Sequence, residues 1–366
     1  MKNYPVSQPL ITELDVHYVN LATKSGWVSS LGEYLDIFEK KFAEFCGVKY
    51  CILTSNGTCA IQLALLSMNL KAGDEVIIPD LTFVATANAV VHAGGIPVFA
   101  DILPDSLNID PQSVERLITP KTKVIIAVHL YGHPAKMDLI NIIAKKHNLF
   151  VIEDAAEAHG AEFHNKIVGG LADCATFSFY GNKIITTGEG GAITTNSDLI
   201  YNKAKFLRDH AMSSDRKYWH EEIGFNFRMT NLQAALGYSQ LLRVESIINE
   251  RSEIFKWYKK HLLLNESVRL NLEEDEVKNV IWLVRLEIDF LDEERRNNLM
   301  IDLKKLGVDT RPYFYPMSLL PMYKNNVFEN KISTMKYDKG INLPTYLGLS
   351  ELDVKNISEI VNKILY

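Results

Sequence analysis

The chain has 366 residues, of which 47% are apolar and 23% are charged, an ordinary balance for a globular enzyme. This length exceeds what one compact core usually holds, so two domains are expected. The formal net charge of −6 disfavours a nucleic-acid-binding protein, because such proteins usually present a basic surface. A small-molecule or acidic ligand bound at local positive points fits the charge better.

The sequence gives no sign of export or of membrane insertion. The first residues, MKNYPVSQPL, lack an apolar signal region, and no apolar run is long enough to span a bilayer. Cys46, Cys51, Cys59 and Cys174 lack CxxC spacing and are expected to be reduced thiols. We therefore expect a cytoplasmic protein that binds neither nucleic acid nor membrane.

The first predicted elements lead to a candidate anion site. Residues 26–47 have apolar side chains at helical spacing, and residues 50–53 form a short apolar strand before a strongly helical run. Ser55 or Asn56 can cap this helix, and Gly57 lets the backbone approach a ligand. Free N–H groups at such a helix start suit an anion, although an ordinary capped helix also accounts for the motif taken alone.

The next segment continues the alternation of strands and helices. Residues 76–79 and 96–102 are predicted strands, and the helix between them is predicted over residues 79–94. Phe83 falls at the start of that helix. It is either a core aromatic or a ring that stacks on a planar ligand.

A fourth strand ends in a histidine-containing segment, YGHP. His129 and His133 have a spacing that zinc ligands use on a helix. Gly132 and Pro134 prevent a helix between them, so we expect no metal site.

Asp154 ends the next strand, which is predicted over residues 150–153. Strand–helix alternation from residue 50 to 155 predicts a mostly parallel, doubly wound sheet. In such sheets ligands bind at the carboxyl ends of the strands. Taken alone, Asp154 is equally compatible with a helix cap, a metal ligand or a ribose ligand.

Lys183 lies between two strand-like runs, TFSFY and AITT, and is followed by a glycine-rich turn at residues 188–191. A lone lysine is usually a surface charge. It becomes a nucleophile toward carbonyl groups only where a cofactor is held against it.

Together these residues match the needs of pyridoxal 5′-phosphate, which requires an anion site, a ring cover, an acid at the ring nitrogen and a lysine. The residues assigned to these roles are Gly57, Thr58 and Ser178 for the phosphate, Phe83 for the ring face, Asp154 for the ring nitrogen and Lys183 for the covalent bond.

Five blocks in order resemble the DegT/DnrJ/EryC1/StrS family of sugar aminotransferases. They are SNGTCAIQLAL, GDEVIIPDLTFVATANAV, VIEDAAEAHGA, FSFYGNKIITTGEGG and GFNFRMTNLQAALG. The resemblance covers nearly the whole chain and implies the α/β fold of PLP-dependent transferases of fold type I (aspartate aminotransferase-like). It implies a large domain at residues 1–248 with a mostly parallel seven-stranded sheet, and a small C-terminal α+β domain at residues 249–366.

The resemblance also implies roles at matching positions. Lys183 holds the cofactor covalently, Asp154 pairs with its ring nitrogen, and Glu157 lies near its ring oxygen. Asn226 reaches the phosphate from a neighbouring subunit, so a homodimer with shared active sites is expected. Because some relatives that remove a hydroxyl carry histidine in place of this lysine, Lys183 favours transamination over dehydration.

Five residues are candidates for the substrate. Arg311 can meet a carboxylate or diphosphate in bidentate fashion, although a surface arginine at a strand end explains it equally well. Tyr315 lies in the same TRPYFYP segment, and His220 follows Trp219 in a segment expected to shape the sugar pocket. Trp27 and Ser29, in the early loop, are candidates for contacts with a nucleotide.

Within the family, the segments VHLYGHP, YWHEEIGFNFRMTN and TRPYFYP are most similar to the GDP-perosamine synthases. The resemblance implies that L-glutamate gives its amino group, leaves as 2-oxoglutarate, and aminates the C4 ketone of GDP-4-keto-6-deoxymannose. The product would serve O-antigen and lipopolysaccharide biosynthesis. A UDP- or dTDP-linked 4-keto-6-deoxyglucose is the alternative acceptor.

Two other classes of function were weighed. A relative that binds the cofactor only as a regulatory module is disfavoured by the intact Lys183 and Asp154. A nicotinamide-dependent oxidoreductase is disfavoured because no GxGxxG follows the first strand.

Overall fold

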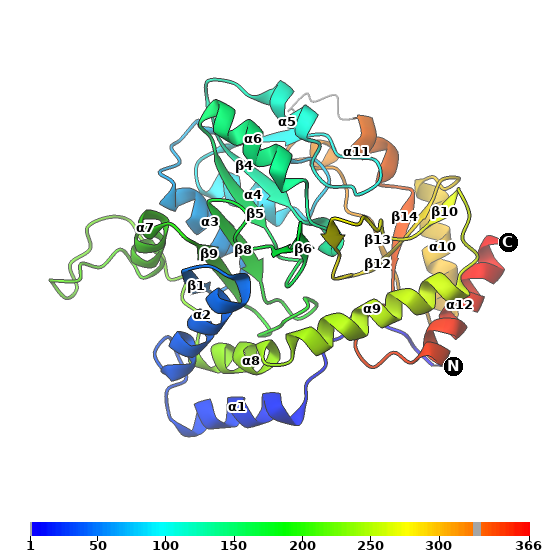
Figure 1. Cartoon of the computed structure of the whole chain (residues 1–366), viewed down its shortest axis with the longest axis horizontal. Helices are drawn as coiled ribbons and strands as arrows, with labels where there is room; N and C mark the ends of the chain where they lie inside the picture. Colours follow the sequence, from blue (N-terminus) through cyan, green and yellow to red (C-terminus); the bar gives the residue numbers. More distant parts are fainter. Residues whose placement is uncertain (1, 325–330) are drawn as a thin grey trace.

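The computed structural model describes residues 2–324 and 331–366 and shows a large and a small sheet, joined by a long helix (Figure 1). The large sheet has seven strands in the order β1-β9-β8-β5-β4-β2-β3. Only β9 runs against its neighbours, β1 and β8, and the other pairs are parallel. The expected mostly parallel seven-stranded sheet is therefore confirmed. Its strands are β1 (Tyr50–Thr54), β2 (Glu75–Pro79), β3 (Ile96–Ala100), β4 (Thr122–Val128), β5 (Phe150–Asp154), β8 (Cys174–Ser178) and β9 (Gly191–Thr195).

Helices cover both faces of this sheet, which explains why its strands read as apolar runs rather than as alternating patterns. Helices α3, α4 and α7 share one apolar core with one face, and α2, α5, α6 and α8 pack on the other. The helices of this part are α1 (Glu13–Lys24), α2 (Glu33–Cys46), α3 (Gly57–Ser67), α4 (Ala85–His92), α5 (Pro111–Leu117), α6 (Met137–His147), α7 (Asp198–Arg208), α8 (Asn231–Leu241) and α9 (Val244–His261).

The boundaries of two helices depend on what their first residues bind. Asn56 caps α3 by accepting the N–H of Cys59, as the sequence suggested. The helix predicted over residues 79–94 instead begins at Ala85, so that prediction is wrong at its start. Pro79 ends β2, and the buried Asp80 binds the hydroxyl groups of two serines from the C-terminal part of the chain. The backbone of residues 80–84 is therefore set by this tertiary contact and is not helical.

The small sheet has four strands in the order β10-β12-β14-β13, all paired antiparallel. The proposed domain boundary at residue 248 falls inside α9. Ile247 and Ile248 of this helix pack in the large core, whereas Ile254 and Tyr258 pack in the small one. The remaining elements are β6 (Glu162–Phe163), β7 (Lys166–Ile167), β10 (Val268–Arg269), β11 (Val277–Lys278), β12 (Val284–Ile288), β13 (Arg311–Pro312), β14 (Gly340–Leu343), η1 (Leu130–Gly132), η2 (Met317–Leu319), α10 (Glu293–Lys305), α11 (Lys331–Lys336) and α12 (Glu351–Leu365).

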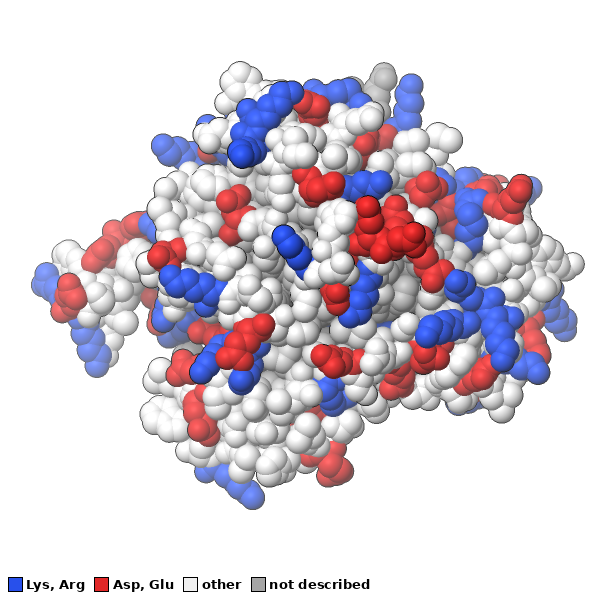
Figure 2. Space-filling model, in the orientation of Figure 1, with Lys and Arg blue, Asp and Glu red and all other residues white. Residues whose placement is uncertain are grey.

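Charges of both signs are interspersed over the face shown in Figure 2, without a continuous basic stripe on that face. In the two described ranges, no helix combines the length and apolar character needed to cross a bilayer.

Candidate active site

Lys183 and two acids meet at the carboxyl edge of the large sheet. β5 ends at Asp154, Glu157 follows in the next turn, and Lys183 lies in the loop after β8. Lys183 Nζ is 3.4 Å from Glu157 Oε1, and the lysine side chain is only 11% exposed. The lysine is thus an inward-facing group rather than a surface charge.

Glu157 is held by the backbone as well as by the lysine. Its Oε2 accepts the N–H of Tyr131 at 2.8 Å. Burial raises the pKa of Glu157, the charge of Lys183 opposes this rise, and the nearby charge of Asp154 adds to it. The glutamate therefore depends on a positive or hydrogen-bond-donating group beside it.

Asp154 is buried and has two donors. Thr86 Oγ1 donates to its Oδ2 at 2.8 Å, and the N–H of Ala156 donates to its Oδ1 at 3.2 Å. Burial raises the pKa of Asp154, and the hydrogen bond from Thr86 opposes the rise. A positively charged ring N–H would stabilise the ionised form, so this acid fits the nitrogen of a pyridine ring.

Thr86 was missed by the sequence reasoning, although the helix predicted over residues 79–94 would place it one turn after Phe83. Residues three apart on a helix face the same side, and this spacing was the signal available. The Phe83 ring itself is 55% exposed and lies 5.9 Å from the ring of Phe314, measured between centroids. It is free to cover a planar ligand.

Aromatic rings from both domains form a row beside Lys183, with Trp282 and Phe314 from the small domain and Tyr131 from the large one. The centroid of the Trp282 ring lies 3.9 Å from Lys183 Nζ, within the range of a cation–π contact. The Trp282 indole N–H donates to the carbonyl of Asn182 at 2.7 Å, which fixes the ring next to the lysine. Tyr131 stacks between Trp282 and Phe314, with centroids 6.2 and 5.6 Å away. Sequence reasoning missed Trp282 and Tyr131, because no local pattern marks a contact between the domains.

The start of α3 lies directly against the end of β8. A Cβ added to Gly57 would lie 2.8 Å from Cβ of Ser178, so only glycine allows this approach. The side-chain oxygen of Asn56 accepts a hydrogen bond from the N–H of Cys59, and the backbone carbonyl of Asn56 accepts one from the N–H of Ala60. We expect an anion at this positive end of the helix to meet the N–H groups of Gly57 and Thr58 together with the Ser178 hydroxyl.

Within the described ranges, six other candidates share no hydrogen bond, ion pair or ring contact with Lys183, Asp154 or Glu157: Trp27, Ser29, His220, Asn226, Arg311 and Tyr315. Asn226 Oδ1 accepts two bonds from Arg228, and His220 Nδ1 lies 2.8 Å from the carbonyl of His210. Their roles stay predictions, which for Asn226 concern a neighbouring subunit.

Arg311 and Tyr315 belong to the small domain. Arg311 is exposed at the start of β13, and the Tyr315 hydroxyl donates to Glu293 at 2.8 Å while accepting from Arg296. Substrate binding by these two residues also stays a prediction.

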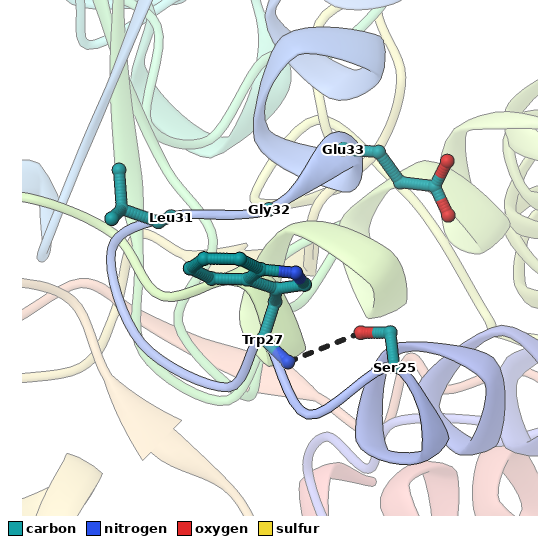
Figure 3. Close-up of a pocket in the computed structure, with 5 residues that line it drawn as sticks. All are labelled: Ser25, Trp27, Leu31, Gly32 and Glu33. Carbon is teal, nitrogen blue, oxygen red and sulfur yellow. Dashed lines mark hydrogen bonds between the residues drawn. The ribbon is translucent and has the colours of Figure 1, made fainter.

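Trp27 borders a pocket of about 360 Å³ (Figure 3). The loop that carries it is fixed on α8: the side chain of Asn231 donates to the carbonyl of Trp27 at 2.7 Å, and its N–H donates to the carbonyl of Ser29 at 2.6 Å. The lining residues are Ser25, Trp27, Leu31, Gly32 and Glu33.

The two histidines with zinc-like spacing have structural partners. His129 Nδ1 accepts the N–H of Ala135 at 3.0 Å, so its Nε2 carries the proton toward Glu153 at 3.1 Å. Glu153 points away from Asp154, because successive residues of a strand face opposite sides. His133 is hydrogen-bonded instead at its Nδ1 to the carbonyl of Pro134.

Comparison with known proteins agrees with this geometry. Residues 9–362 match the model of the DegT/DnrJ/EryC1/StrS aminotransferase family. The chain belongs to this family. It is 43% identical to the GDP-perosamine synthase of Caulobacter vibrioides over 98% of each chain. It is 42% identical to the GDP-perosamine synthase of Escherichia coli O157:H7 over 99% of each.

Solved structures show the same fold. Helicobacter pylori PseC, an aminotransferase of pseudoaminic acid biosynthesis, has a TM-score of 0.92 at 29% identity and covers 99% of both chains. Spr1654, a sugar-aminotransferase candidate of Streptococcus pneumoniae, was solved in PLP and PMP forms. Its PLP form has a TM-score of 0.94 at 27% identity, covering 99% of this chain and 98% of that one.

Proposed function

We propose that this protein is a pyridoxal-phosphate-dependent transaminase that moves the amino group of L-glutamate to the C4 ketone of a nucleotide-linked 4-keto-6-deoxy sugar. GDP-4-keto-6-deoxymannose is the favoured acceptor and GDP-perosamine the favoured product. The relatives named GDP-perosamine synthase, at 42% and 43% identity over nearly the full chain, support this choice. The proposal includes the cytoplasmic location expected from the sequence.

One observation carries the cofactor assignment. Lys183, Asp154 and Glu157 converge at one edge of the sheet, and burial raises the pKa of both acids. The anion cradle of Gly57 and Ser178 completes the requirements of pyridoxal phosphate. Bound there, this cofactor accepts the electrons of the bond that breaks at the amino-bearing carbon.

The side chains then divide the work. Asp154 would hold the ring nitrogen and stabilise its positive charge. Lys183 would hold the cofactor covalently and, as a free amine, would move a proton at the reacting carbon. Trp282 and Glu157 hold that amine in place when it is free, as they do in this structure. The ketone oxygen of the acceptor leaves as water when the new amine forms.

A homodimer with shared active sites is part of the proposal. The segment between α7 and α8 projects from the body of the molecule (Figure 1). Its tip exposes large apolar side chains, with Tyr218 78% and Ile223 90% exposed. An arm of this kind is suited to pack on a second copy, which would carry Asn226 toward the partner's phosphate cradle.

The cofactor assignment is tested on the purified full chain. We expect visible absorbance that borohydride removes, with the reduced adduct mapped by mass spectrometry to Lys183. Lys183→Ala should lose the covalent adduct and at least 10³-fold in activity, by analogy with other removed nucleophiles. A covalent adduct in the alanine variant would exclude this role.

The acceptor is tested with a panel of nucleotide-linked sugars. L-glutamate is supplied with the GDP-, UDP- and dTDP-linked 4-keto-6-deoxy sugars, and 2-oxoglutarate release is measured together with the aminated product. We expect the GDP-linked acceptor to be preferred. Preference for UDP or dTDP would favour the alternative acceptor, and release of a deoxygenated sugar would indicate dehydration.

A further inference from the structure

We propose that the pocket beside Trp27 is the nucleobase subsite and that Glu33 selects guanine there. This inference rests on the proposed function, because it assumes that the substrate carries a nucleotide. It adds the residue that discriminates between bases.

The pocket offers a flat apolar surface next to an unpaired acid. The Trp27 side chain is 56% exposed and borders the cavity, and the indole lies between Ser25 and the 31–33 segment in Figure 3. Glu33 lines the same cavity and, within the described residues, makes no ion pair or side-chain hydrogen bond. At about 360 Å³ the cavity has room for a purine, and an exposed indole is a general stacking surface for bases.

The acid decides which base fits. Guanine presents two adjacent donors, N1–H and the 2-amino group, which match the two oxygens of a carboxylate. Hypoxanthine keeps N1–H but lacks the 2-amino group. Uracil and thymine present a single N–H between two carbonyl oxygens, and those oxygens would face the carboxylate charge. A free carboxylate at Glu33 therefore favours guanine and disfavours the pyrimidines.

Hydrogen bonds through α8 link the pocket to the turn that follows Lys183. Asn231 holds the backbone of Trp27 and accepts the N–H of Tyr34 at 3.0 Å, which fixes both ends of the loop. Gln233, one helical turn beyond the α8 cap, donates to the carbonyl of Glu189 in the turn that follows Lys183. A nucleotide base at Trp27 would thus be held in a fixed relation to the reacting lysine.

Calorimetric binding of GDP, IDP and UDP to the full chain tests the proposal without any turnover. The wild type should bind GDP about tenfold more tightly than IDP, as expected for one hydrogen bond to a charged group, and UDP more weakly still. Glu33→Ala and Glu33→Gln should make the affinity for GDP nearly equal to the affinity for IDP, whose base is hypoxanthine. Trp27→Leu should weaken all three nucleotides by about tenfold or more.

Asp36→Ala is the matched control, because Asp36 is an exposed carboxylate on the same helix and does not line the pocket. It removes the same charge from the same helix and should leave the GDP-to-IDP ratio unchanged. Equal affinity of the wild type for GDP and IDP would overturn the proposal, and so would an unchanged ratio in both Glu33 variants. Failure of the proposed function shows separately, as an absence of glutamate-dependent amination of any nucleotide sugar.

Discussion

At the scale of single residues, the site depends on charges placed where water does not reach. Asp154 and Glu157 are buried with raised pKa values, and the lysine that compensates them lies against the face of Trp282. A buried carboxylate is costly unless a donor or a cation accompanies it. The burial that makes these carboxylates costly also suits them to a cationic ring.

His159 gives a pH-dependent prediction. It lies among Phe42, Phe177 and Phe179, and burial lowers its pKa to about 3, with the charge of Lys183 acting in the same direction. The unfolded chain takes up a proton near pH 6.5, whereas the folded chain does not until near pH 3. His159 therefore removes stability as the pH falls between these values, by up to about 1.4 kcal/mol per pH unit.

Urea unfolding of wild type and His159→Leu between pH 7 and 4 measures this contribution. The variant should show a shallower loss of stability on acidification. Asp154 and Glu157, whose raised pKa values act with the opposite sign, are present in both proteins and cancel in the difference. His92→Leu, at an exposed histidine, should follow the wild type. Equal slopes for wild type and His159→Leu would contradict the prediction.

At the scale of elements, the phosphate cradle is a contact between a helix start and a strand end. Gly57 is the first residue of α3 and Ser178 is the last residue of β8. They lie so close together that only the hydrogen of a glycine fits between them. Gly57→Ala should push the two elements apart and weaken cofactor binding by about tenfold or more, while costing roughly 1–3 kcal/mol of stability.

A double-mutant cycle separates this steric effect from loss of the hydroxyl. Ser178→Gly removes the atom that the new Cβ would meet, so Gly57→Ala should cost much less in that background. Affinity for pyridoxal phosphate, measured by fluorescence titration of the four proteins, is the readout. Additive effects of the two substitutions would show that the elements are not in contact as described.

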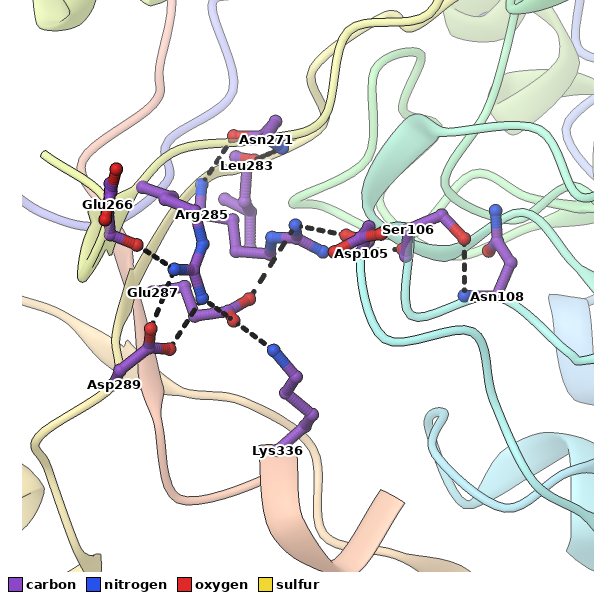
Figure 4. A network of polar contacts seen from close by, with 11 residues as sticks. Asp105, Ser106, Asn108, Glu266, Asn271, Leu283, Arg285, Glu287, Asp289 and Lys336 are labelled. Atoms are coloured by element: carbon purple, nitrogen blue, oxygen red, sulfur yellow. Dashed lines mark hydrogen bonds and ion pairs between the residues drawn. The ribbon is translucent and has the colours of Figure 1, made fainter. Parts of the chain in front are cut away.

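At the scale of the whole molecule, hydrogen bonds from Arg285 join the small domain to the large one, and a buried ion-pair network lies beside them within the small domain (Figure 4). Arg285 on β12 donates to the carbonyl of Asp105 in the large domain at 2.6 Å. Glu287, 2% exposed, accepts from Arg269 at 2.8 Å and from Lys336 at 2.6 Å. The acid thus balances several cations at the junction that also positions Trp282.

Glu287→Gln should therefore destabilise the protein by about 3 kcal/mol, because it leaves the buried Arg285 and the largely buried Lys336 without their counter-charge. Asp289→Asn is the control: Asp289 pairs with the same arginine but is 45% exposed, so it should cost less than about 1 kcal/mol. Chemical denaturation of both variants makes the comparison. Similar small losses would mean that the network contributes little.

The projecting arm leads to a prediction about assembly. Sedimentation should give twice the chain mass of 41.5 kDa. Ile223→Glu should weaken the dimer by at least about tenfold, since it places a charge in an apolar contact. Ile142→Glu, at an exposed isoleucine of α6, is the matched control and should leave the dimer intact. A monomeric wild type would contradict the shared active site.

The sequence alone predicted the large sheet, which the structure confirms, and it proposed site residues whose roles stay predictions. Apolar runs alternating with helices predict parallel strands, and the carboxyl ends of such strands must meet at one edge, which is why Asp154 could be assigned. Gly57 and Asn56 form a local helix-cap pattern, and Lys183 was interpreted as a cofactor lysine because these other residues occur in the same sequence. Each of these signals lies within one short segment.

Contacts between distant segments were decided only by the tertiary structure. Trp282 reaches Lys183 from the small domain, Thr86 donates to Asp154 from another helix, and Asp80 moves the start of α4 by binding serines far along the chain. Glu33 joins Trp27 because Asn231 folds their loop onto α8. No local period or propensity records such pairings, because their free energy arises only when the whole chain has folded.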